Sequence, residues 1–479
     1  MTTSSLKKSS IRKRKSFYNL QTCGLFRSKL AVLVFLIYSK IEVITMENKK
    51  KYIPRMVDGE LDFYLKSVGG VLIVGPKWCG KSTTAKKHAR TVIDLLKRKE
   101  REQYVKLAKE APEVLLNSGP KPILIDEWQV ISFIWNSLKE EIDENGDFGQ
   151  YILTGSVTDN TRDDGLSGDV NERHTGTGRI IKKMMRTMSL YESGDSNGGV
   201  SISSLKKNVF NASFCQNTIS DYAYFLCRGG WPLAIGKEKD VALQQAKTFF
   251  DGLVSEDLFS LRDVPLRKDE DRARRLLRSY ARNISTEASN ESIKADLKEN
   301  GEEIDKDTFS KYLLALSRLY VTEELEAWNP NLRSKTAIRE KNTRHFVDPS
   351  IATAALNATP ENIFNDMKTF GLLFEELAIR DLRIYCDSIG GSIYHYRDHN
   401  DREADAVIQF NDDSWALVEV KLTDQKQIDE ASNKLVDLAK DIDNSLHPKP
   451  SFLMVITAGR AAYRDENGVY IVPLGCLKN

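Results

Sequence analysis

The stretch that decides the fold is Gly75-Pro76-Lys77-Trp78-Cys79-Gly80-Lys81-Ser82, within a chain of 479 residues. These eight residues fit the pattern G-x-x-x-x-G-K-[ST] in full, with an apolar run before them and a helical pattern after them. Glycines let backbone N–H groups converge on a phosphate without obstruction by a Cβ atom, and the N-terminus of the following helix adds positive charge. The stretch therefore predicts a phosphate-binding loop between a strand and a helix.

The side chains of this loop have predicted roles toward ATP. Lys81 would reach the β- and γ-phosphates as a catalytic cation, and the Ser82 hydroxyl would ligate Mg²⁺. A thiol at Cys79 could be oxidation-sensitive, but the alternative, a small residue that simply fits the loop, is the interpretation we favour. The nucleotide-lining set is completed by Gly75, Pro76, Lys77, Trp78, Cys79, Gly80 and Thr83.

Two acids follow the next apolar strand, which we expect at Ile123–Ile125. Parallel α/β sheets bind ligands at the carboxyl ends of their strands, so Asp126 and Glu127 would lie beside the phosphate loop. Asp126 would hold Mg²⁺, directly or through water, and Glu127 would polarise the attacking water as a general base. An Asp-Glu pair after a strand can also be a plain helix cap, but the preceding phosphate loop favours the catalytic interpretation.

Alternation of strands and helices sets the fold class of this part. Apolar runs at Val71–Val74 and Tyr151–Leu153 read as further strands, and Ser82–Leu96 reads as a helix. This order predicts an α/β domain, with a parallel sheet and helices on both faces.

The overall charge balance argues neither for nor against a nucleic-acid partner. Lys and Arg number 70 against 68 Asp and Glu, so any surface that attracts nucleic acid would have to be local. The six cysteines form no CxxC pair, which argues against a zinc site and is typical of reduced thiols in the cytoplasm.

The first 45 residues differ from the rest of the chain. The apolar run Leu30–Tyr38 is shorter than the roughly 20 residues that a membrane-spanning helix needs. Small residues of the kind that mark a signal-peptide cleavage site do not follow it. We interpret residues 1–45 as a disordered or mis-annotated extension and expect no stable membrane insertion, with a membrane tether or export as the alternatives.

The middle of the chain is predicted to be helical. Residues 272–327 contain three helical segments followed by the strand-like run Tyr320–Leu325, an order that suits a winged-helix unit. The first of these helices is rich in arginine, which indicates either a solvated face or a DNA contact. The arginines concerned are Arg272, Arg274, Arg275, Arg278 and Arg282.

A second group of reactive residues lies near the C-terminus. Glu419 and Lys421 are two apart on a predicted strand and so project to the same side, while Asp405 begins the preceding arm of a hairpin. With Glu375 on a helix, their order resembles the PD-(D/E)xK nuclease pattern. That resemblance implies Mg²⁺ at Asp405, Glu419 and Glu375, with Lys421 positioning water or stabilising charge. An ordinary amphipathic strand, or a domain that binds without cutting, remains the alternative.

Several short runs together resemble one large prokaryotic family, the AAA-type P-loop ATPases that carry a C-terminal restriction-endonuclease-like domain of unknown function. The resemblance covers about Tyr52 to the C-terminus and implies an ATP-binding domain, a winged-helix middle and a nuclease-like end. It also implies that Ser156 or Thr154 senses the γ-phosphate or orients water, with a plain helix cap as the alternative. Arg173 or Arg179 could serve a neighbouring copy as an arginine finger, but we favour the interpretation of surface arginines. The runs are YIPR from Tyr52, GPKWCGKS from Gly75, IDEWQ from Ile125, YILTGS from Tyr151, HTGTGRI from His174, MSLYESG from Met188 and RGGWP from Arg228.

We therefore expect a cytoplasmic Mg²⁺-dependent ATPase with three folded parts. Their predicted bounds are 46–200 for the ATP-binding domain, 201–335 for the helical, winged-helix-like region and 336–479 for the nuclease-like domain. Two other functions stay open, namely an ATP-gated metal-dependent nuclease and a regulatory module that binds ATP without turnover. DNA or RNA and further copies of the same chain are candidate partners.

Overall fold

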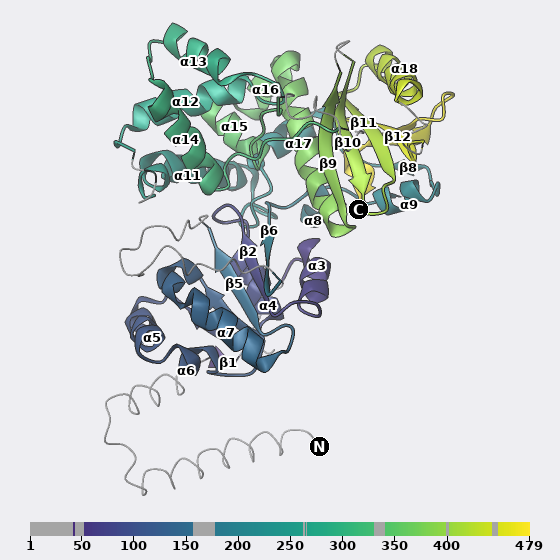
Figure 1. The fold of residues 1–479 in the computed structure, drawn as a ribbon. Coiled ribbons are helices and arrows are strands. Elements are labelled where there is room, and N and C mark those ends of the chain that lie inside the picture. The colour runs from purple at the N-terminus through teal and green to yellow at the C-terminus, as the bar shows by residue number, and fades with distance from the viewer. Residues whose placement is uncertain are drawn as a thin grey trace, which may run out of the picture.

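The computed structural model describes residues 42–43 and 52–479, apart from 157–177, 262–263, 265, 330–340, 399–401 and 443–448. The predicted apolar run Leu30–Tyr38 and the candidate finger Arg173 lie outside the described residues. Figure 1 shows an α/β part at the bottom of the view, a helical part above it, and a second sheet beside the helical part. In the part of the chain that the structure describes, no helix is both long and apolar enough to cross a membrane.

The first sheet has the strand order β1-β3-β4-β5-β2-β6, in which the five strands from β3 to β6 run parallel and β1 pairs antiparallel with β3. Strands β2, β4 and β5 confirm the three predicted strands. The strand bounds are β1 Glu42–Val43, β2 Gly70–Val74, β3 Thr91–Asp94, β4 Ile123–Asp126, β5 Tyr151–Gly155 and β6 Ile180–Met184.

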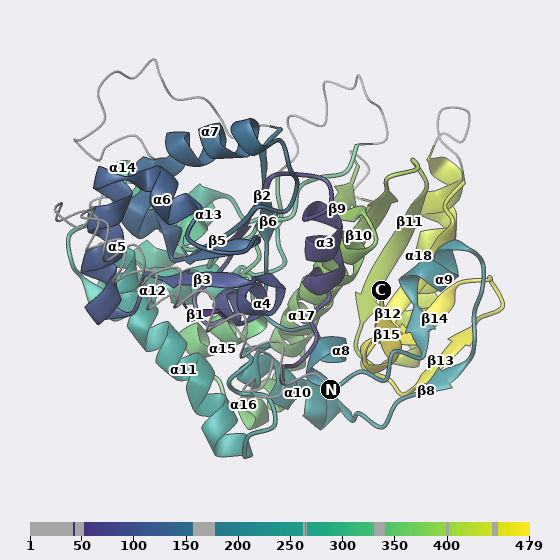
Figure 2. The same ribbon diagram turned by 90° about the horizontal axis from the view of Figure 1, so that it is seen from below.

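Successive residues of a strand point to opposite faces of the sheet, and here residues on both faces are apolar. Helices therefore cover both faces. Ile123 and Ile125 pack in one core with α5, α6, η2 and α7, whereas Leu124 packs in the other with α3 and α4. Figure 2 shows α7 and α4 on opposite sides of the strands. The helix bounds are α3 Val57–Tyr64, α4 Lys81–His88, α5 Arg98–Glu110, α6 Pro112–Leu116, η2 Trp128–Ile134 and α7 Trp135–Asn145.

One predicted element of this part is wrong. The helix expected over Ser82–Leu96 ends at His88, and the chain then forms strand β3. Thr91, Val92 and Ile93 are β-branched, and their backbone pairs with the edge of β4, so the sheet overrides the continuing helical pattern.

The helical part contains three consecutive helices, α12, α13 and α14, as predicted. The segment after α14 forms two isolated antiparallel bridges, Thr322 to Phe346 and Leu325 to Thr343, where a winged-helix unit would place a regular hairpin. The helix bounds are α10 Ile219–Arg228, α11 Lys239–Ser255, η3 Asp257–Phe259, α12 Glu270–Arg282, α13 Asn290–Glu299, α14 Lys306–Arg318, α15 Pro349–Leu356 and α16 Pro360–Asn365.

The second sheet has the order β8-β13-β14-β12-β11-β10-β9 and is packed between two helices. Helix α17 (Met367–Ser388) joins the core that contains Val418 and Val420, and α18 (Gln425–Asp441) covers Leu417 on the other face. The strand bounds are β8 Ser213–Phe214, β9 Gly391–Arg397, β10 Glu403–Phe410, β11 Trp415–Lys421, β12 Phe452–Thr457, β13 Ala461–Arg464 and β14 Tyr470–Pro473.

The segment after the first sheet joins the second sheet before the helical part begins. Strand β7 (Val200–Ser201) pairs with β15 (Leu477–Lys478), and β8 pairs with β13. Strands β7 and β8, between residues 200 and 214, therefore pair with strands of the C-terminal part, whereas the predicted bounds assigned residues 201–214 to the helical region.

Candidate functional site

The phosphate loop connects β2 to α4, at the carboxyl end of β2. Gly75 has φ +146°, and a Cβ atom there would lie 2.1 Å from the carbonyl oxygen of Met185. Gly80 has φ +104° and precedes the first residue of α4. Glycine is required at Gly75 by close packing and at Gly80 by the left-handed backbone, which explains both glycines of the motif.

Lys81 lies folded back over its own loop. Its ammonium group donates to the carbonyl oxygens of Gly75 (2.8 Å) and Pro76 (2.7 Å), and the side chain is buried. The cation is thus held at the centre of the loop, where the backbone N–H groups of such a loop face a phosphate.

Asp126 joins two hydroxyl groups from neighbouring elements. Its Oδ1 accepts hydrogen bonds from Ser82 Oγ (2.7 Å) and from Thr154 Oγ1 (2.6 Å), and the residue is fully buried. Its Oδ2 lies 3.0 Å from the ammonium of Lys86, which also pairs with Asp94 Oδ2 at 3.1 Å. Burial alone would lower the pKa of Lys86, but Asp126 and Asp94 raise it above its ordinary value. The structure therefore brings Ser82 and Asp126 together as predicted.

Glu127 adopts a left-handed backbone conformation, φ 61° and ψ 52°, which is uncommon for a residue with a side chain. Its N–H donates to Thr154 Oγ1 (3.0 Å), so Thr154 touches both acids. The Glu127 carboxylate accepts from Gln129 Nε2 and lies 3.5 Å from Ser156 Oγ. Ser156 thus contacts the predicted general base, and these contacts fix where its carboxylate lies.

The donor set at Ser82 and Asp126 fits Mg²⁺. This ion takes oxygen ligands and is usually held in nucleotide sites by one or two protein oxygens, with phosphates and water completing its shell. Within the described residues no group of three or more His, Cys, Asp or Glu side chains is placed to hold a metal ion. A nucleotide-bound Mg²⁺ needs only one or two protein ligands. The Ser82 hydroxyl and the Asp126 carboxylate, whose oxygens lie 2.7 Å apart, can supply them.

Arg55 anchors the loop from outside the motif. It is buried and donates to the carbonyl oxygens of Cys79 (2.8 Å), Arg186 (2.9 Å) and Thr187 (3.0 Å). Its Nε also forms a buried ion pair with Glu192 at 3.0 Å. Arg55 is the last residue of the YIPR run, for which the sequence alone indicated no role.

Two loop residues that were predicted to line the nucleotide contact the helical part. Lys77 pairs with Asp257 of η3 at 2.5 Å. The Trp78 ring meets Phe249 of α11 edge-on, with centroids 6.0 Å apart, and Phe249 stacks on Trp231 at 4.3 Å. The phosphate loop therefore contacts both α11 and η3 of the helical part.

Among the remaining predicted residues, Cys79 is buried and free, and its thiol donates to the carbonyl of Met185 at 3.3 Å. This supports the interpretation of a small side chain that fits the loop. Arg179 pairs through its Nε with both oxygens of Asp143, at 2.6 and 2.8 Å, within the same chain.

The four predicted residues of the C-terminal part also converge. Asp405 Oδ2 accepts from the N–H of Val420 (2.7 Å) and lies 3.6 Å from Lys421 Nζ, which donates to Glu419 Oε2 at 2.9 Å. On α17, burial and the neighbouring charge of Asp405 raise the pKa of Glu375 well above its ordinary value.

This C-terminal group differs from the predicted metal centre. Lys434 of α18, which sequence reasoning missed, lies 2.8 Å from Glu419 Oε1, so two ammonium groups flank a carboxylate that is fully buried. Burial and Asp405 nevertheless raise the pKa of Glu419 to about 7, against the effect of the lysines. Glu375, Asp405 and Glu419 do not form a metal-holding cluster among the described residues. The ammonium groups of Lys421 and Lys434 thus place positive charge beside Glu419, where the predicted centre would have a metal ion.

Comparisons with known proteins divide the chain into three matched segments. Residues 69–193 match the model of an AAA domain, which supports an ATP-binding ATPase. Residues 219–362 and 370–477 match two domains of unknown function, DUF8612 and DUF4143. No curated protein matches the chain. One of the solved structures that match, a Walker-type ATPase of Pyrococcus abyssi, is 16% identical over 66% of this chain and 99% of its own, with a TM-score of 0.41.

Proposed function

We propose that this protein is a Mg²⁺-dependent ATPase of the AAA type. The observation that carries the proposal is the meeting of Ser82 and Thr154 on one oxygen of Asp126. The three residues come from the phosphate loop and from two adjacent parallel strands. In P-loop NTPases the hydroxyl after the loop lysine and a strand-end acid hold the Mg²⁺ of the bound triphosphate. Here Ser82 and Asp126 have those positions, and Thr154 lies near the end of β5, the strand that lies between β2 and β4.

The chain's own groups would divide the work as follows. Lys81 would exchange its loop carbonyls for the β- and γ-phosphates and neutralise charge that develops on them. Ser82 and Asp126 would hold Mg²⁺, which when bound would neutralise charge on the phosphate oxygens. Glu127 would accept a proton from the attacking water, with Gln129 and Ser156 holding its carboxylate in place.

Turnover distinguishes this function from a module that only binds ATP. Phosphate release should be measurable for the wild type and should fall by about 10²-fold or more in Glu127→Gln, the range over which a positioned base contributes. ATP-induced thermal stabilisation should survive in that variant. Glu140→Gln, an exposed acid on α7, is the matched control and should retain activity. Equal turnover in wild type and Glu127→Gln would refute the base assignment, and binding without turnover in both would favour the regulatory module.

We propose as a second function that the C-terminal part binds or acts on nucleic acid. The convergence of Asp405, Glu419 and Lys421 favours it, whereas the pairing of Glu419 with Lys434 argues against a preformed metal centre. Incubation with plasmid DNA or RNA and Mg²⁺ or Mn²⁺ tests cleavage, which Lys421→Ala should abolish. Cleavage that persists in Lys421→Ala would remove the nuclease assignment, and retention of nucleic acid without cleavage would support binding alone.

A further inference from the structure

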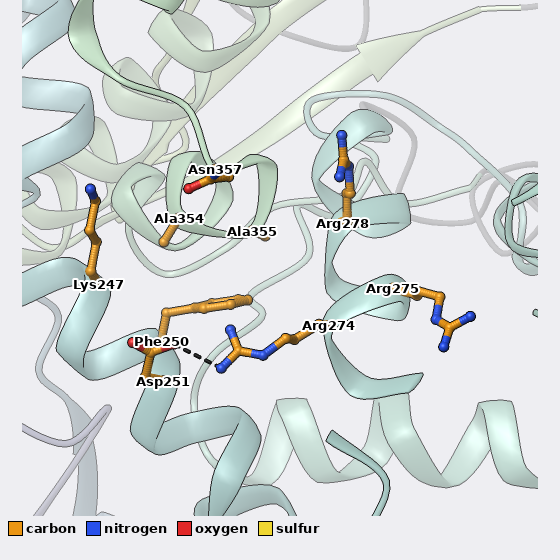
Figure 3. A pocket seen from close by; sticks show the side chains of 9 residues that line it. All are labelled: Lys247, Phe250, Asp251, Arg274, Arg275, Arg278, Ala354, Ala355 and Asn357. Carbon is orange, nitrogen blue, oxygen red and sulfur yellow. Dashed lines mark hydrogen bonds and ion pairs between the residues drawn. The ribbon is translucent and has the colours of Figure 1, made fainter. Parts of the chain in front are cut away.

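A basic cavity lies in the helical part, away from the phosphate loop. It has a volume of about 310 Å³ and lies between α11, α12 and α15 (Figure 3). The side chains that matter here are Lys247, Phe250 and Asp251 from α11, Arg274 and Arg278 from α12, and Ala355 from α15. Arg275 of α12 also lines the cavity, so its lining includes four cationic side chains and one acidic side chain, Asp251.

Two of the four cationic side chains of this cavity already have an acidic partner. Arg274 pairs with Asp251 at 2.9 Å and lies over the Phe250 ring, 5.5 Å from its centroid. Figure 3 shows Arg275 pointing away from this pair, and its Nη1 lies 3.5 Å from Glu302. In the part of the chain that the structure describes, Lys247 and Arg278 form no ion pair or hydrogen bond through their side chains. These two exposed cations are therefore available to a ligand.

The two arginines of α12 that lie outside the cavity already have acidic partners. On α12, Arg272 pairs with Glu302 at 2.7 Å and Arg282 pairs with Asp296 at 2.9 Å. A long polyanion would need an extended row of uncompensated cations, because its affinity depends on neutralising many phosphates at once. On α12, the positive charge without an acidic partner is confined to the cavity, which favours a compact anion over a nucleic acid strand.

The floor of the cavity is apolar. Phe250 is 5% exposed and Ala355 8% exposed, so both present small, fixed patches of carbon at the bottom of the hollow. Small-molecule sites combine such a floor with a few polar groups, and their volumes begin near 300 Å³.

We propose that this cavity binds a small phosphate-bearing molecule that has a flat apolar portion. Lys247 and Arg278 would hold the phosphate through charge-assisted hydrogen bonds. The apolar portion would rest against Phe250, and Arg274 stays bound to Asp251 and forms part of the wall. The proposal is independent of the ATPase assignment. Helix α11 nevertheless contacts both sites, because Phe249 packs on Trp78 of the phosphate loop and the next residue, Phe250, lines the cavity.

Calorimetric titration of the full chain with 1-naphthyl phosphate tests the proposal, with 1-naphthol and inorganic phosphate as the apolar and anionic halves of the probe. We expect saturable binding of 1-naphthyl phosphate, weakened by about tenfold or more in the double variant Lys247→Gln/Arg278→Gln. Lys237→Gln/Arg267→Gln removes the same charge from exposed positions outside the cavity and should bind like the wild type. The ATP-induced thermal shift should be the same in all three proteins, which separates this site from the phosphate loop.

Three results would overturn the proposal. Equal weakening in both double variants would show only a general effect of surface charge. Binding of 1-naphthol as tight as that of 1-naphthyl phosphate would show a site for apolar molecules. Binding of a single-stranded oligonucleotide that is tighter than that of the probe and is lost in Lys247→Gln/Arg278→Gln would identify a nucleic acid surface instead.

Discussion

Replacement of Arg55 by methionine tests whether the phosphate loop depends on a buried anchor outside its motif. Methionine keeps much of the apolar stem but removes the guanidinium, which donates to three backbone carbonyls and to Glu192. The side chains of the pair are only 5% and 3% exposed, so water cannot replace the lost partner without opening the structure.

The expected loss follows from the burial of Glu192. Removing one member of a buried ion pair leaves the other charge uncompensated, at a cost of about 3–5 kcal/mol. Glu192 keeps donors from the N–H groups of Met56 (2.6 Å) and Ser189 (2.8 Å), which places Arg55→Met toward the lower end of that range. The carbonyl of Cys79 would lose its 2.8 Å hydrogen bond, and ATP affinity should fall with stability.

Urea unfolding followed by tryptophan fluorescence measures this loss. Arg179→Met is the matched control, because its pair with Asp143 is exposed (39% and 49%) and should contribute little to stability. In the double variant Arg55→Met/Glu192→Gln the loss should be smaller than the sum of the single losses by about 1–3 kcal/mol. A loss in Arg55→Met no larger than that in Arg179→Met, or strict additivity in the double variant, would refute the reasoning.

Substitutions at three further positions give separate predictions. Gly75→Ala places a Cβ atom 2.1 Å from the carbonyl of Met185 and should abolish the ATP-induced thermal shift, unlike the same change at an open glycine. Thr154→Val removes the hydroxyl that bonds Asp126, so urea unfolding should show a loss of about 1–3 kcal/mol, and phosphate release should fall, whereas Thr154→Ser should recover both. The pKa of Glu419 is raised to about 7 from its usual 4.5, so the folded chain retains a proton that the unfolded chain has released. The free energy of unfolding should then fall as pH rises between these values, and Glu419→Gln should flatten that slope; an unchanged slope would contradict the assignment.

The local sequence was sufficient to predict the phosphate loop and the strands that flank it. Its glycines, lysine and hydroxyl each have a reason that acts within a few residues, and β2 and the first three residues of β4 carry no polar side chain. Strand β3 was missed because the helical pattern of α4 continues into Thr91 without a glycine or proline to end it. Pairing with β4, a partner distant in the chain, extends along all of Thr91–Asp94 and makes this segment a strand.

The same distinction applies to the site residues. Asp126 and Glu127 could be predicted because they end a strand, but the position of Thr154 over both acids depends on the register between β4 and β5. The contacts of Arg55 and Lys434 likewise come from residues distant in the sequence, Glu192 and Glu419. The IDEWQ run contained Gln129, yet nothing local indicated that its amide would bond Glu127.

Calorimetric titration of the full chain with ATP and Mg²⁺, repeated with Lys81→Ala, tests the central claim most directly. We expect the wild type to bind ATP at one saturable site, more tightly with Mg²⁺ than without it. Lys81→Ala should lose most of this affinity. At about 100 times the dissociation constant, ATP should also stabilise the wild type by about 2.7 kcal/mol. A wild-type chain that takes up no ATP, or a Lys81→Ala chain that binds it equally well, would contradict the account.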